Sequence, residues 1–116
     1  MAFDAALAAR IRRLLGRHEG VAEKKMFGGL CFLAGGRMVC GVMADALLAR
    51  VAAAEMDALL KRPGVRPMTF TGRAMRGFVV VAGTVLARDE ELLAWIERGR
   101  AVADAMPAKR ARPRRR

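Results

Sequence analysis

Residues 26–44, MFGGLCFLAGGRMVCGVMA, consist of two apolar runs separated by Gly35 and Gly36. A pair of glycines supplies the positive φ angles that a two-residue hairpin turn of type I′ or II′ requires. We therefore predict a β-hairpin in which Leu33 faces Met38 across the turn.

Both faces of this predicted hairpin are apolar. A sheet with one face in water shows apolar and polar residues in alternation, whereas the only charged side chain between residues 26 and 44 is Arg37. We therefore expect both faces of the sheet to be covered, by helices or by another subunit.

Apolar spacing and turn residues in the rest of the chain predict elements in the order α-β-β-β-α-β-β-α. Outside the hairpin these are a helix over 4–17, a strand over 47–51, a short helix over 52–61, strands over 66–70 and 78–81, and a helix over 89–106. Pro67 favours an edge position for its strand because it has no N–H to donate. Residues 71–77, TGRAMRG, are predicted to form a loop. The order describes an α+β fold of two layers, with helices on an antiparallel sheet made of a β-meander and a second hairpin.

The length of 116 residues fits one domain, which we place at residues 1–106. Residues 107–116 are dominated by arginine and contain no large apolar side chain, so we predict a disordered basic tail there. Few cysteines and no apolar stretch of signal-peptide or membrane-spanning type predict a cytoplasmic protein with no membrane partner.

The composition argues against the common catalytic and metal sites. Serine and tyrosine are absent, which excludes a Ser-His-Asp triad and a tyrosine general acid. His18 is the only histidine, and no CxxC motif is present, so the sequence predicts no metal and no cofactor. We assign no catalytic residue.

Cys31 and Cys40 face each other in the predicted register, at a non-hydrogen-bonded position where the Cα atoms lie close together. A disulfide is geometrically conceivable there, which makes the two thiols a candidate redox pair. The alternative is a pair of buried cytosolic thiols that behave as small apolar residues.

The formal net charge of +11 favours acidic partners. The cations of the tail, which would contact nucleic acid or other polyanions, are Lys109, Arg110, Arg112, Arg114, Arg115 and Arg116. A second group, at strand ends and in the predicted 71–77 loop, is expected to converge at one rim of the sheet as an anion or partner surface: Lys24, Lys25, Arg66, Arg73, Met75 and Arg76. Arginine-rich codon usage is the alternative explanation of this charge.

Four stretches carry a resemblance to a known family: KKMFGGLCFLAGGRMVCGV (24–42), DALLARV (45–51), RPMTFTGRAMRGFVVV (66–81) and LLAWIERG (92–99). In this order they resemble the TfoX/Sxy N-terminal domain family of bacterial proteins, which is associated with competence regulation. The resemblance implies a two-layer α+β fold and transfers no catalytic residue. Competence regulators carry a second, C-terminal domain, where this chain has its arginine tail.

The first functional hypothesis is a standalone, non-enzymatic binding or regulatory module. It would act through protein–protein contacts, with a protein partner or as a homodimer formed through the doubly apolar sheet or the last helix. The alternative is non-specific nucleic-acid binding through the basic tail and the 71–77 loop. A third hypothesis, a small-ligand or enzymatic domain, requires a deep pocket at residues 26–29 and 72–77 lined by groups with shifted pKa values.

Overall fold

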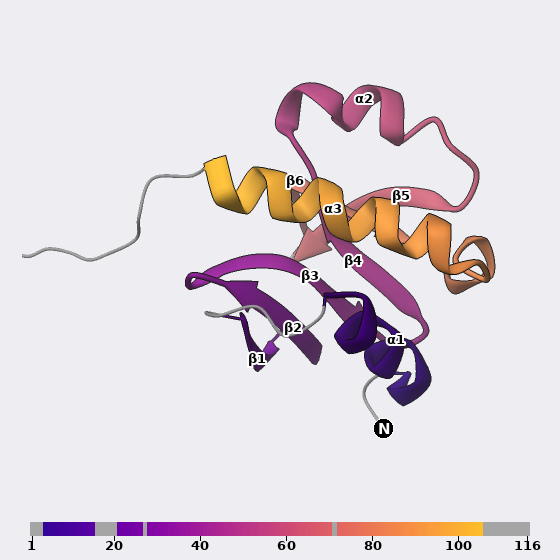
Figure 1. Ribbon diagram of the computed structural model, residues 1–116. Coiled ribbons are helices and arrows are strands. Elements are labelled where there is room, and N and C mark those ends of the chain that lie inside the picture. The colour runs from indigo at the N-terminus through magenta and orange to yellow at the C-terminus, as the bar shows by residue number, and fades with distance from the viewer. Residues whose placement is uncertain (1–3, 16–20, 27, 71, 106–116) are drawn as a thin grey trace, which may run out of the picture.

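The computed structural model describes residues 4–15, 21–26, 28–70 and 72–105. Figure 1 shows one twisted antiparallel sheet with the helices packed against it. The predicted α+β architecture and the predicted order of its elements are confirmed. The residues just before the predicted hairpin, expected only to lead into it, form a strand of their own.

The helices are α1 (Ala5–Leu15), α2 (Met56–Leu59) and α3 (Asp89–Ala105), with short 3₁₀ turns η1 (Ala53–Glu55) and η2 (Gly83–Val85). The strands are β1 (Val21–Met26), β2 (Gly29–Ala34), β3 (Arg37–Met43), β4 (Ala46–Arg50), β5 (Val65–Phe70) and β6 (Arg73–Val81). They lie in the order β1-β2-β3-β4-β6-β5, so β6 is inserted between β4 and β5. The edge strands are β1 and β5, and Pro67 occupies an edge strand as predicted.

The glycine pair forms the turn between β2 and β3. The φ angles are 60° at Gly35 and 82° at Gly36, and both are positive, as a type I′ turn requires. Leu33 pairs with Met38 in the predicted register. The sequence therefore predicts correctly the turn and the residues next to it.

Beyond that pair, the register of the hairpin shifts. Phe32 faces Cys40, and Cys31 faces Gly41. A bulge of this kind adds one residue to one strand and turns the following side chains to the opposite face. The predicted pairing of Cys31 with Cys40 is therefore wrong, because uniform alternation was assumed along both strands.

Residues 71–77, predicted to form a loop, mostly belong to β6. Gly72 lies in a turn, and Arg73 already pairs with Phe70 of β5. Gly77 has a φ of 84° within the strand, where the pairing with β5 is irregular. The two glycines therefore have different roles, one in a turn and one inside a strand, and sequence reasoning took both as loop signals.

The main core lies between the sheet and the helices. Its largest fully buried members from both layers are Ile11, Phe32, Val39, Val42, Leu47, Val79, Leu86, Leu92 and Ile96. Helix α3 passes very close to β3: a Cβ added at Gly99 would collide with the carbonyl oxygen of Val39 and lie 3.0 Å from its carbonyl carbon. The absence of a side chain at Gly99 thus sets the distance between helix and sheet.

Polar contacts fix α1 against the start of α3. Asp4 caps α1, and its Oδ1 accepts hydrogen bonds from the N–H groups of Ala6 and Leu7. The Arg10 guanidinium donates to Asp89 at 3.0 Å and to the carbonyl oxygen of Leu86 at 2.7 Å. The hydrogen bonds that Asp89 accepts from Arg10, together with one from Arg13 at 2.6 Å, hold the pKa of Asp89 below its usual value.

The opposite face of the sheet carries a second apolar cluster, which we call the far face. It consists of Cys31, Leu33, Met38, Met43, Ala46, Leu48, Met68, Met75, Phe78 and Val80. All ten residues belong to strands, so no helix of the described chain contributes to this cluster. Helices thus cover one of the two apolar faces that the sequence predicts, while strand side chains alone make up the other cluster.

Candidate functional site

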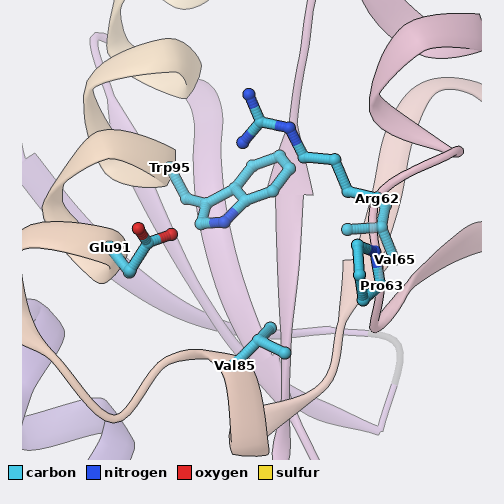
Figure 2. Close-up of a pocket in the computed structure, with 6 residues that line it drawn as sticks. All are labelled: Arg62, Pro63, Val65, Val85, Glu91 and Trp95. Carbon is cyan, nitrogen blue, oxygen red and sulfur yellow. The ribbon is translucent and has the colours of Figure 1, made fainter.

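A pocket of about 300 Å³ lies between α3, the turn before β5 and the 3₁₀ turn η2. Figure 2 shows the six side chains that line it: Arg62, Pro63, Val65, Val85, Glu91 and Trp95. Four of them are apolar, and the two charged ones have opposite signs. Ligand pockets commonly measure roughly 300–1,000 Å³, so this one suits a small molecule. We call it the Trp95 pocket.

Main-chain geometry holds the two turns that form the walls of this pocket. The N–H of Ala82 donates to the carbonyl oxygen of Gly64 at 2.8 Å, which joins the turn before β5 to the segment that begins η2. Gly64 has a φ of 80°, and a Cβ there would lie 2.9 Å from Cγ1 of Val85. Glycine therefore makes the turn and leaves room for the Val85 side chain, so the walls are formed before any ligand binds.

Trp95 is the largest side chain of the pocket, and it is only 2% exposed. The guanidinium carbon lies 4.9 Å from the ring centroid for Arg98 and 5.8 Å for Arg62, within the range of cation–π interactions. The indole N–H has no hydrogen-bond partner among the described residues. Its nitrogen is not fully buried either. Figure 2 shows this nitrogen on the ring edge toward Glu91 and Val85. The pocket therefore contains an available hydrogen-bond donor.

Arg62 and Glu91 bring opposite charges to the same pocket without pairing with each other. The ion pairs within the described ranges include neither side chain. Figure 2 shows Arg62 and Glu91 on opposite sides of the Trp95 indole. The pocket therefore offers a cationic contact at one end and an anionic contact at the other.

A second pocket, of about 270 Å³, lies between α2 and the β5–β6 hairpin. Its lining consists of Ala53, Met56, Asp57, Leu60, Pro67, Met75 and Arg76. The sulfur of Met56 accepts a hydrogen bond from the N–H of Gly77 at 3.0 Å, which holds α2 against β6. Two predicted site residues, Met75 and Arg76, line this pocket. Of the segment 26–29, which the small-ligand hypothesis placed beside residues 72–77, the fully described residues Gly28 and Gly29 are not part of its lining.

The structure divides the predicted basic surface between the two edges of the sheet. Lys24 and Lys25 are exposed on β1, whereas Arg66, Arg73 and Arg76 are exposed on β5 and β6. Three strands separate β1 from β6, which corresponds to about 19 Å at the usual strand spacing. The prediction that all of them converge at one rim is wrong, because the order of the strands cannot be read from the positions of single cations.

Both cysteines are free thiols and both are buried. Burial raises the pKa of Cys31 to about 11 and raises that of Cys40 still more strongly. Because the thiolate is the reactive form, these environments keep both groups unreactive at neutral pH. Cys40 belongs to the main core and Cys31 to the far face. The redox role of the two cysteines stays a prediction. The direct pairing of Cys31 with Cys40, on which it was based, is not present.

Other predictions concern metals, membranes and the tail. The described residues contain no group of three or more His, Cys, Asp or Glu side chains that could hold a metal ion. No helix in the same ranges is long and apolar enough to cross a bilayer. The basic tail and His18 lie outside the described residues.

Sequence analysis did not single out the Trp95 pocket. For this part of the chain the sequence predicted only a helix over 89–106, which the structure confirms as α3. Two signals were available: Trp95 is the only tryptophan, and Pro63-Gly64 marks a tight turn. Neither shows that this turn lies against α3, because the contact depends on the strand order.

The TfoX N-terminal domain family matches residues 13–103 of the chain. This range includes all six strands and most of α3. The chain therefore belongs to the TfoX N-terminal domain family, as the sequence resemblance implied. No curated protein and no solved structure gives a significant match.

Proposed function

We propose that this chain is a non-enzymatic binding and regulatory module that acts through protein–protein contacts and forms a homodimer. Its family makes it a competence-regulator-like module. To this we add that the module makes protein–protein contacts and that the far face is the surface that makes them. The observation that carries the proposal is the far face, an apolar surface of the sheet to which no helix in the described part of the chain contributes.

The far face has a buried centre and a half-buried border. Leu48 in the centre is 0% exposed, whereas Leu33, Met43, Met75 and Phe78 are only partly buried. Six of the ten residues are at most 5% exposed in the single chain, so the surface that a partner can reach is the half-buried border. Apolar side chains gathered at a surface are typical of interaction sites. Methionine is common at such sites because its flexible thioether adapts to the shape of a partner.

A second copy of the chain is the occupant that this surface favours. Two-fold dimers bring the same patch of both subunits together, and they are the commonest assemblies of soluble proteins. The far face crosses several strands of the sheet, so two copies can stack sheet on sheet with their apolar borders in contact.

Light scattering coupled to size exclusion tests the dimer. We expect the unmodified chain to elute at twice its mass of 12.6 kDa. The substitution Met43→Glu places a charge at the border of the far face and should give a folded monomer. The matched control Ala54→Glu adds the same charge at an exposed position of η1 and should leave the dimer intact. A strict monomer at high concentration, or equal behaviour of both variants, refutes the proposal.

A second candidate function is non-specific binding of nucleic acid through the basic tail and residues 71–77. It is supported by the net charge of +11 and by the exposed positions of Arg73 and Arg76 on β6. Deletion of residues 107–116 should remove most affinity for a fluorescent DNA duplex. For the full chain, the slope of the logarithm of the binding constant against the logarithm of the salt concentration should be no steeper than about −5 if six cations contact phosphates. An affinity that depends neither on the tail nor on salt refutes this function.

A further inference from the structure

We propose that the Trp95 pocket binds a free apolar α-amino acid of about the size of leucine. This inference does not rest on the proposed dimer, because the pocket is formed by α3 and two turns and contains no residue of the far face. It rests on the size of the pocket, on its apolar walls, and on the Glu91 carboxylate and the Trp95 indole N–H, which have no ion-pair or hydrogen-bond partner within the described residues.

The walls select a small apolar body. Pro63, Val65 and Val85 form one side of the pocket and the indole of Trp95 the other. A volume of about 300 Å³ is too small for a nucleotide, whereas a branched side chain of four carbons fits within it. Contact of such a side chain with these walls removes apolar surface from water, which is the main source of affinity.

The polar groups select a zwitterion. The carboxylate of Glu91 is suited to an ammonium group, and it has no cationic partner in the described part of the chain. The indole N–H of Trp95 lies on the ring edge toward Glu91 and is suited to a carboxylate, whereas Arg62 lies on the opposite side of the indole. An α-amino acid carries an ammonium and a carboxylate on one carbon, so its ammonium can contact Glu91 and its carboxylate the indole N–H while its side chain enters the pocket.

The chain provides its own reporter of binding. Trp95 is the only tryptophan, so an amide-correlation NMR spectrum of the full chain contains a single indole N–H signal. Titration with L-leucine should shift this signal in a saturable way, with half-saturation at or below about 1 mM. The same titration with glycine, which has no apolar side chain, should reach half-saturation only at a concentration at least about tenfold higher than with leucine.

Modified ligands and variants test each polar contact separately. N-acetyl-leucine lacks the ammonium group and leucinamide lacks the carboxylate, and each should bind at least about tenfold more weakly than leucine. The substitution Glu91→Gln should weaken the binding of leucine by a similar factor and leave the affinity for N-acetyl-leucine unchanged. The control Glu97→Gln lies exposed on the same helix outside the pocket and should change neither.

The proposal is overturned if leucine up to about 20 mM gives no saturable shift of the indole signal. It is equally overturned if glycine or N-acetyl-leucine binds as tightly as leucine, or if Glu97→Gln weakens leucine as much as Glu91→Gln does. A dispersed spectrum for each variant shows that it is folded. Because the dimer is measured separately, by light scattering, failure of one proposal is distinguishable from failure of the other.

Discussion

The substitution Gly99→Ala tests how α3 is seated on the sheet. Helix propensity alone predicts that alanine stabilises the interior of a helix by about 1 kcal/mol relative to glycine. The tertiary structure predicts the opposite sign. An added Cβ would collide with the carbonyl oxygen of Val39 and lie 3.2 Å from its Cγ1. The carbonyl belongs to the main chain of β3, so it cannot rotate away as a flexible side chain would.

The magnitude follows from these two opposing effects. To reach ordinary contact distances, α3 must move away from β3 by about 1 Å, which loosens the packing of buried side chains such as Leu92 and Ile96. Overpacking of a core costs about 1–3 kcal/mol. Because the collision is with main-chain atoms, the cost lies at the upper end of this range, and after the gain in helix propensity is subtracted we expect a net loss of about 2 kcal/mol in the free energy of unfolding. At about 4–8 °C per kcal/mol for a domain of about this size, this corresponds to a Tm lower by about 8–16 °C.

Thermal unfolding followed by circular dichroism measures this difference. Ala101→Gly is the matched control, because it removes a Cβ at an exposed position of the same helix, and it should cost about 1 kcal/mol through propensity alone. If Gly99→Ala is as stable as the unmodified chain or more stable, α3 is not packed on β3 as described, and the reasoning about this contact fails.

Three further predictions concern single side chains. Asp4→Ala removes the cap of α1 and should lower the free energy of unfolding by about 1 kcal/mol in urea denaturation. The pKa of Asp89 is lowered chiefly by the hydrogen bond from Arg10. This contributes stability at pH values above the unfolded-state pKa of about 4, and the contribution is lost as the pH falls through the pKa of the folded state. Asp89→Asn should therefore lower the Tm at pH 7, and a difference that persists at about pH 2 would contradict this linkage. Because burial raises the pKa of Cys31 and of Cys40, neither should react with iodoacetamide at pH 7.5 until the chain is unfolded, which mass spectrometry can follow; rapid labelling of the folded chain would show that the thiols are accessible.

Local signals in the sequence were sufficient for the elements and their order. The glycine pair at 35 and 36 predicted the hairpin turn, the apolar spacing over residues 89–106 predicted the last helix, and Pro67 indicated an edge strand. Each of these signals depends on the chemistry of one to four neighbouring residues, so it can be read without knowledge of the rest of the fold.

Non-local features were not predictable in the same way. The bulge between β2 and β3 moved Cys40 to the helix side, because bulges have no reliable sequence signal when both strands are apolar. The insertion of β6 between β4 and β5 separated Lys24 from Arg66 and brought the turn at Gly64 to η2. The Trp95 pocket depends on that last contact, so it could not be derived from spacing along the chain.

The far face can be tested most directly through the ε-methyl groups of its methionines. The measurement is the broadening of assigned methionine methyl NMR signals by a soluble paramagnetic agent, recorded at low and at high protein concentration. If the far face joins two copies, the signal of Met43 becomes protected as the concentration rises. Met56, which packs against the main core, keeps the same broadening throughout. Broadening of Met43 that is independent of concentration would contradict the proposal that this surface makes protein contacts between copies of the chain.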